Sequence, residues 1–397
     1  MYHDSAEYNY FGGAVSLQQD TEIIAQGGNF LTSHENKTQS SVSIYHLEDD
    51  QSWSLNQRLY DSHPLSSFGS SIAFDGNTFI VGARSYSEIR NPFSQNGTVY
   101  IYNFNDVNDW EISDKLHPQE EWNTFFGSTV ALNGDRLVVS SNSKTHMFLN
   151  SRVSIDDPVY VYKFNNGIWN LEDSITFLSG FFVERLGTSI SLNDHEIALS
   201  SITKSGTSLP NKVLIFNFEN GQSSFKQRLP DHTEEELDGF GQHIEMTETD
   251  LVISSNEGKW HNEKTIYCYQ KNDIGLWVLS QLITHQSNSS FSKFGESFYL
   301  DEDKLIISNA SKFTFLQKPN QGELNYYVKI RDKWTLNRIV PIEELSSTES
   351  LGYNLSMSNG KIMVGMPQAD FPLRDSGIVY FLDVEPLEFL FEGFFVY

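Results

Sequence analysis

The chain is poor in cysteine and in basic residues, and both shortages limit what it can do. Cys268 is the only cysteine in 397 residues, which excludes a disulfide framework and a metal cluster of thiolates. Lys and Arg number 27 against 52 Asp and Glu, so the formal net charge is −25. Such a surface repels phosphate backbones and anionic lipids. We therefore expect no nucleic-acid partner and no insertion into a membrane.

Long apolar runs and helical patterns are also missing. Met1-Tyr2-His3-Asp4 lacks the basic start and the apolar stretch of a signal peptide, and no later run is long enough to span a membrane. No segment keeps an apolar period of 3.6 residues, which predicts almost no helix. Serine-hydrolase elbows, phosphate loops, zincin helices and nucleotide fingerprints are absent from the sequence. These absences favour an all-β protein without a known catalytic motif.

A long internal repeat is the main positive feature. Seven glycines recur every 54 to 60 residues: Gly12, Gly69, Gly127, Gly187, Gly241, Gly295 and Gly352. Five of them follow Phe, and Gly187 and Gly352 follow Leu. Units of this length cannot bury their own faces and must pack against one another. A closed ring of such units leaves only short, protected sheet edges.

Each repeat predicts four strands. In the second repeat these are Phe68 to Phe74, Phe79 to Ala83, Val99 to Tyr102 and Trp110 to Leu116. Asp75-Gly76 between the first two is a strong hairpin signal, because such a turn needs positive φ. We therefore predict a seven-bladed β-propeller of four-stranded antiparallel blades, as a single domain over residues 1–397. The blades are predicted to begin near residues 11, 68, 126, 186, 240, 294 and 351.

Tryptophan recurs at one position of the repeat. Five of the seven tryptophans open the predicted fourth strand: Trp53, Trp110, Trp169, Trp277 and Trp334. A large aromatic residue is a common filler where sheets meet face to face, so we expect these side chains to pack between blades. The alternative is a ligand groove lined by tryptophan.

The two ends of the chain complete the count of strands. Residues 1–10 resemble the linkers that precede the other Phe-Gly pairs, so the chain starts just before an innermost strand. The apolar segment 387–397 is then predicted to be the outermost strand of the last blade, since an unpaired tail of this kind would aggregate. The alternative is that this segment docks into a partner or a further domain.

These motifs resemble the FG-GAP repeat family, whose best known members form the propeller of integrin α subunits. The resemblance lies in Phe68-Gly69-Ser70-Ser71-Ile72, Phe126-Gly127-Ser128-Thr129-Val130 and the Val-Gly ends of second strands at Val81-Gly82 and Val364-Gly365. It implies cell adhesion and an extracellular or cell-surface location. Calcium-binding members hold the ion in an Asp-rich loop between the first two strands. Turns such as Asp75-Gly76-Asn77 are too short to wrap an ion, so no calcium or other cofactor is expected.

The predicted connections differ in length between the two faces of the ring. Turns between first and second strands are short, whereas those between second and third strands are long and variable. Variable loops on a rigid scaffold are the usual arrangement of a recognition surface. The candidate ligand-binding residues are those of the long loops around Arg84, Tyr86, His146 and Trp260.

Histidine also recurs, soon after the fourth strand of several repeats. The weak catalytic candidates are His63, His117, His232 and His285, with Glu120-Glu121, Glu234-Glu235-Glu236 and Glu343-Glu344 in corresponding places. A ring of imidazoles and carboxylates near the channel mouth could hold a divalent metal or act as acid and base. The spacing from each His to the next Phe-Gly varies, which favours solvated loop residues instead. No metal site is therefore predicted.

Three functions remain open from the sequence. The first is a non-catalytic recognition or adhesion propeller that binds a protein or glycan through the face with the long loops. The second is an enzyme, a lyase or hydrolase, with a His/Glu site at the channel mouth. The third is a structural subunit of a surface or filament assembly, to which the apolar C-terminal segment points.

Overall fold

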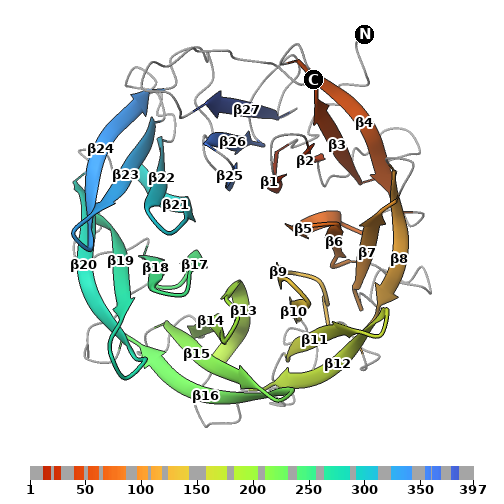
Figure 1. Cartoon of the computed structure of the whole chain (residues 1–397), viewed down its shortest axis with the longest axis horizontal. Coiled ribbons are helices and arrows are strands. Elements are labelled where there is room, and N and C mark those ends of the chain that lie inside the picture. The colour runs from red at the N-terminus through yellow and green to blue at the C-terminus, as the bar shows by residue number, and fades with distance from the viewer. Residues whose placement is uncertain are drawn as a thin grey trace, which may run out of the picture.

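The computed structural model is a ring of antiparallel β-sheets around a central axis (Figure 1). It describes residues 12–18, 22–27, 40–48, 52–61, 66–85, 96–105, 109–118, 124–142, 158–176, 183–203, 211–230, 239–255, 263–286, 292–311, 323–341, 354–358, 360–367 and 377–383. Every regular element in these ranges is a strand, as the missing helical period predicted.

Six of the sheets are complete blades of four strands. The first three contain β1 (Val15–Gln18), β2 (Glu22–Gly27), β3 (Ser41–Leu47) and β4 (Trp53–Tyr60); β5 (Phe68–Asp75), β6 (Thr78–Ala83), β7 (Thr98–Phe104) and β8 (Trp110–Leu116); and β9 (Val130–Asn133), β10 (Arg136–Ser140), β11 (Val159–Asn165) and β12 (Ile168–Ile175). The next three contain β13 (Val183–Leu192), β14 (Glu196–Thr203), β15 (Lys212–Glu219) and β16 (Gln222–Leu229); β17 (Ile244–Met246), β18 (Asp250–Ser255), β19 (Glu263–Lys271) and β20 (Trp277–Gln286); and β21 (Ser292–Leu300), β22 (Lys304–Ser311), β23 (Glu323–Ile330) and β24 (Lys333–Pro341).

The prediction of seven four-stranded blades needs correction at the last repeat. Its sheet has three strands in the described residues, β25 (Asn354–Ser358), β26 (Lys361–Met366) and β27 (Ile378–Asp383). The ring therefore has six complete blades and not seven. Segment 387–397, predicted as the missing outermost strand, lies outside the described residues and stays a prediction. The hairpin signal between first and second strands located the repeats correctly. It gives no information on whether an outermost strand pairs with the third strand of the last repeat.

Strands follow one another in sequence order within every sheet, so the first strand of each blade lies innermost and the fourth lies on the circumference (Figure 1). No described sheet combines strands from both ends of the chain. The two end sheets instead meet through side chains: the Trp53 and Phe381 rings stack with centroids 4.8 Å apart. Leu17 N donates to Ser356 Oγ over 2.9 Å, which links the innermost strands of the same two sheets.

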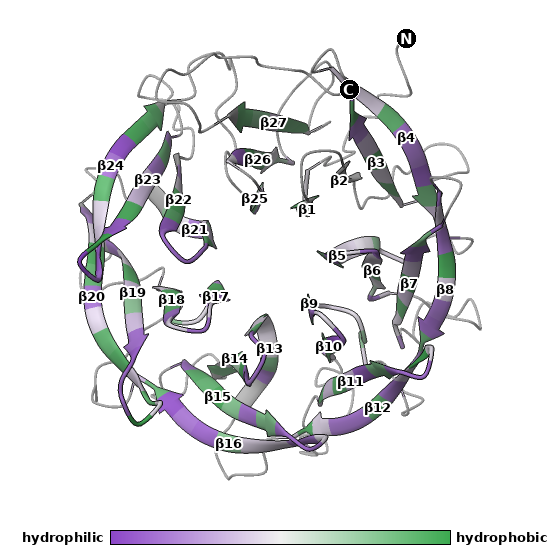
Figure 2. Cartoon of the chain, viewed as in Figure 1, coloured by the Kyte–Doolittle hydropathy of each residue, from purple (hydrophilic) through white to green (hydrophobic). Residues whose placement is uncertain are grey.

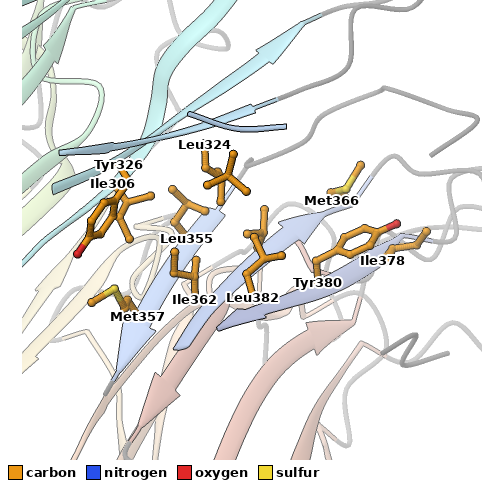
Figure 3. Packing of buried hydrophobic residues seen from close by; sticks show 12 residues of the cluster. Ile306, Leu324, Tyr326, Leu355, Met357, Ile362, Met366, Ile378, Tyr380 and Leu382 are labelled. Atoms are coloured by element: carbon orange, nitrogen blue, oxygen red, sulfur yellow. The ribbon is translucent and has the colours of Figure 1, made fainter. Parts of the chain in front are cut away.

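The core lies between blades. Along the outer strands, such as β8, β12 and β24, hydrophobic and hydrophilic residues alternate (Figure 2). Successive side chains of a strand point to opposite faces of the sheet, so the two faces of an outer strand differ in hydropathy. One cluster packs Ile306 and Leu324 of one sheet against Leu355 and Ile362 of the next (Figure 3). The expected role of the repeated tryptophans is confirmed, since Trp110 and Trp277 lie in clusters with residues of the preceding blade.

The Phe-Gly positions have a steric reason. Phe126 is fully buried, and Gly127 has φ +84°, a conformation that residues with a side chain rarely adopt. Gly97, which forms a bridge to Phe126, has φ +79°. A Cβ atom on Gly97 would lie 2.0 Å from the Phe126 carbonyl oxygen. The close approach of two blades therefore depends on this glycine.

Gly97→Ala and Gly134→Ala separate the two effects of these glycines. Gly134 also has positive φ, +56°, but an added Cβ meets no atom within 4 Å. We expect Gly134→Ala to lower the free energy of unfolding by about 1 kcal/mol through backbone strain alone. Gly97→Ala adds a clash with backbone and should cost about 3 kcal/mol or more. Urea denaturation measures both, and equal losses would show that the close approach is unimportant.

Candidate functional site

Only three of the candidate residues lie in the described part of the chain. Arg84 follows β6 and is exposed, His117 follows β8, and His285 belongs to β20. His63, His232, Tyr86, His146, Trp260 and the glutamate runs lie outside it, so those predictions stay open.

His285 lies at the junction of two blades. It belongs to an outermost strand, and its ring stacks on Phe294 at the start of the next blade with centroids 5.0 Å apart. Asn309 Nδ2 lies 3.2 Å from His285 Nε2 and also donates to Glu323 Oε1. Because an amide nitrogen only donates, His285 Nε2 is the acceptor in this contact. This side chain contributes to blade packing.

His117 contacts its own blade. Its Nδ1 lies 3.1 Å from Thr98 Oγ1, at the start of the neighbouring strand β7. The Thr98 hydroxyl donates its single proton to the Gly97 carbonyl, so Nδ1–H of His117 is the donor to Oγ1. The imidazoles of these two candidates therefore follow or belong to outermost strands and contact the sheet at that level. Neither belongs to an inner strand beside the channel (Figure 1).

A buried carboxylate that sequence reasoning missed holds the fourth and fifth blades together. Glu196 begins β14, and its side chain is 2% exposed. Lys226 of its own blade pairs with Oε1, and Lys271 of the next blade lies 3.0 Å from Oε2. Trp277 Nε1 donates to Oε2 over 3.1 Å. Two cations and an indole thus compensate the cost of burying this carboxylate.

The first residue of the second strand, the position of Glu196, is charged in neighbouring blades as well. Asp250 begins β18 and pairs with Lys329 of the next blade at 2.5 Å. Lys271 and Lys329 lie over the rings of Trp277 and Trp334, at 4.7 and 5.8 Å from the centroids.

At the junction of the third and fourth blades the cation begins the second strand, and the third strand of the next blade carries an aromatic residue in place of the lysine. Arg136 begins β10, and its guanidinium lies 4.2 Å from the centroid of Phe218, which occupies the position of the lysines. Burial lowers the pKa of Arg136, and the nearby carboxylates, Asp135 first, oppose this shift. Each of these junctions therefore places a cation beside an aromatic ring.

A second repeated contact runs around the circumference. Gln57 Nε2 donates to the Trp110 carbonyl and its Oε1 accepts from Trp110 N, at 3.0 and 2.8 Å. Gln227 contacts the backbone of Trp277 in the same way, and Gln281 contacts that of Trp334. The sequence carries a sign of this contact, because Gln57 and Gln281 each follow a Trp by four residues.

The described residues offer little for metal or thiol chemistry. Among them, no group of three or more His, Cys, Asp and Glu side chains is placed to hold a metal ion. The prediction that calcium is absent stays a prediction. Burial raises the pKa of the Cys268 thiol to about 12, with a smaller contribution from Asp250. Within the same ranges no helix has the length and apolar character needed to cross a bilayer.

Comparison with known proteins shows the fold and nothing finer. The chain matches no known family, and it has no match among curated proteins. A chain of the outer-coat vertex of COPII on membranes superposes with a TM-score of 0.57 and 10% identity, over 97% of this chain and 87% of that one. The β-propeller domain of the Trilobed protease from Pyrococcus furiosus gives 0.54 and 8%, over 95% and 93%. Acylaminoacyl peptidase of Pyrococcus horikoshii gives 0.53 and 11%, over 96% of this chain and 53% of the peptidase.

The resemblance to the FG-GAP repeat and integrin family was wrong. No family model matches, and the similar structures come from the COPII coat, the Trilobed protease and acylaminoacyl peptidase. The physical reason is that a Phe-Gly pair meets a local need of this fold, a buried ring beside a residue with positive φ, and such a need does not identify a family. The extracellular location had depended on this resemblance and is untested.

Glu196→Gln tests the buried charge network. The change leaves Lys226 and Lys271, with side chains 18% and 22% exposed, without their anion. We expect the free energy of unfolding to fall by about 2 to 3 kcal/mol, somewhat less than for a fully buried pair because the lysines reach solvent. Glu248→Gln, at an exposed turn, is the matched control and should cost less than about 0.5 kcal/mol. Similar losses for both variants in urea denaturation would contradict a structural role of Glu196.

Cys268 should resist thiol reagents while the protein is folded. Only the thiolate reacts, and a pKa raised to about 12 leaves almost none of it at pH 8. We expect an aromatic disulfide reagent to label one thiol per chain in denaturant and none within an hour in buffer. Rapid labelling of the folded protein would show that β19 opens or that the thiol is accessible.

Proposed function

We propose that this chain is a non-catalytic binding scaffold that recognises a protein or a glycan. The observation that carries the proposal is that several acid, base and cationic groups of the described residues lie at the blade junctions. His285 is stacked against Phe294 and contacts Asn309, and Glu196 is paired with two lysines. Groups held in this way are poorly suited to proton transfer, which needs a side chain within reach of a substrate.

The face that carries the long connections is the proposed binding surface. First and second strands are joined by two or three residues, as between Asp75 and Thr78. Second and third strands are separated by between seven residues, from Ser255 to Glu263, and eighteen residues, from Ser140 to Val159. In antiparallel blades of this order the two kinds of connection leave on opposite faces. Sequence variety is therefore concentrated on one side of a rigid ring.

An enzymatic role is the second candidate, and one observation favours it. The fold is similar to part of acylaminoacyl peptidase, of whose chain this protein matches about half. The third possibility, a structural subunit, depends on segment 387–397, which lies outside the described residues.

Binding and hydrolysis can be compared on one set of variants. The probes are a printed glycan array, a phage-displayed peptide library and a panel of chromogenic esters and peptides. Residues 143–157, the longest connection, are replaced by a short Gly-Ser linker. The control inserts a Gly-Ser segment after Gly134, in a turn of the opposite face, and changes the length of the chain by about as many residues.

We expect selected ligands to lose binding on replacement of 143–157 and to keep it with the Gly134 insertion, while both variants unfold at the temperature of the wild type. We expect no turnover of esters or peptides by any variant. Turnover that is lost in His117→Ala or His285→Ala, at unchanged stability, would contradict the proposal and favour the enzyme.

A further inference from the structure

An imidazole and a carboxylate contact each other at β17, the innermost strand of the fifth blade. His243 immediately precedes β17 and Glu245 belongs to it. His243 Nε2 lies 3.1 Å from the Phe298 carbonyl oxygen of the next blade and 3.3 Å from Glu245 Oε1. A carbonyl oxygen only accepts, so Nε2–H is the donor to Phe298. The two side chains are 26% and 35% exposed, and β17 lies beside the central channel (Figure 1). We call His243 and Glu245 the channel pair.

Comparison among the repeats shows that the ring does not require the channel pair. At the position of His243, a hydroxyl is enough to connect neighbouring blades elsewhere, since Ser71 Oγ donates to the Gly127 carbonyl over 2.8 Å. The position of Glu245, four residues after the repeated glycine, is uncharged in the six other repeats: Ser16, Ala73, Ala131, Ser191, Tyr299 and Ser356. A carboxylate costs more to remove from water than any of these residues, so packing alone does not account for Glu245.

Negative charge prevails around the channel pair. Within the described ranges, the innermost strands have no Lys or Arg after the repeated glycine, and their charged residues there are Asp75, Glu245 and Glu296. Burial raises the pKa of the Tyr299 phenol on the next innermost strand, and the charges of Asp301 and Glu245 raise it further. The buried carboxylates that begin β14 and β18 are paired with lysines, whereas the described ion partner of Glu245 is an imidazole. A cation is therefore the complement of this site.

We propose that Glu245 binds the side chain of a lysine or arginine presented by a protein or peptide ligand, with His243 as a positioning residue. The His243 Nε2–H group holds Glu245 Oε1, which leaves Oε2 to accept a charge-assisted hydrogen bond from the ligand. The net charge of −25 attracts a ligand of this kind. This inference rests on the proposed binding function and narrows its ligand to one with a basic side chain.

The place of the channel pair and the few acid groups around it favour an organic cation over a metal ion. The chain enters β17 from the face with the long connections and leaves it through the short turn to β18, so a ligand held by those connections can reach the pair. Among the described residues, no group of three or more His, Cys, Asp and Glu side chains is placed to hold a metal ion. One carboxylate suits a single ammonium or guanidinium group, which needs no shell of several ligands.

Two peptides test the requirement for positive charge. The first is an acetylated pentapeptide of glycine with one central arginine, and the second carries citrulline, the neutral analogue of arginine, in its place. Calorimetric titration of the full chain should give about tenfold tighter binding of the arginine peptide, and raising the salt from about 50 to about 500 mM should remove most of this preference. Glu245→Gln should abolish it. Glu111→Gln, at an exposed position of β8, makes the same change in net charge and should keep it.

Two variants test the positioning role of His243. His243→Leu removes the donor to Glu245 and should weaken binding of the arginine peptide about threefold or more, whereas His243→Gln keeps an N–H donor and should restore it. Melting temperatures of all variants establish that each is folded.

Equal affinity for the two peptides, no binding of either, or an arginine preference that survives Glu245→Gln overturns the inference. The proposed binding function fails separately, when no ligand selected from the peptide library or the glycan array depends on residues 143–157. Selected ligands that depend on 143–157 but bind equally well to Glu245→Gln leave that function standing and contradict the cation site alone.

Discussion

Packing between neighbouring blades is the constraint on which the structure depends. A four-stranded sheet of this kind buries neither face by itself, and each hydrophobic cluster, such as the one that joins Ile306 to Leu355, takes residues from two sheets. The ends of the chain meet in the same way, through the stacked rings of Trp53 and Phe381. The ring is therefore closed by side chains in the described residues, without a sheet shared by both ends.

Polar groups reinforce the same junctions. The backbone of the next blade bonds to the side chains of Gln57, Gln227 and Gln281. Glu196 and Asp250 pair with lysines from the next blade. A buried carboxylate is costly unless it is paired, so these contacts specify which surfaces meet as much as they stabilise them. This arrangement gives the two described candidates, His117 and His285, structural roles, and it is the reason for favouring binding over catalysis.

The face with the long connections has a role of its own in the proposed function. One face carries the long connections, and on the circumference Leu282 and Ile339 stand where the first two blades carry Arg58 and Lys115. Both features are departures from the repeat at positions where the fold tolerates variety. In a protein made of similar units, the repeats themselves show which residues the architecture requires, because a residue that varies freely among blades is not needed for the ring.

The sequence by itself determined the strands, their order and the place of the tryptophans, because hairpin turns and alternating apolar residues are local patterns with a direct structural meaning. It did not determine the family, because Phe126-Gly127 meets a local steric requirement that does not identify one. It also did not determine whether 387–397 forms the last strand, because no turn signal in the sequence specifies that pairing. Only the tertiary structure decided that Glu196 meets Lys271 and that Arg136 meets Phe218. These residues are more than fifty positions apart, and nothing in their own segments indicates a partner across a blade junction.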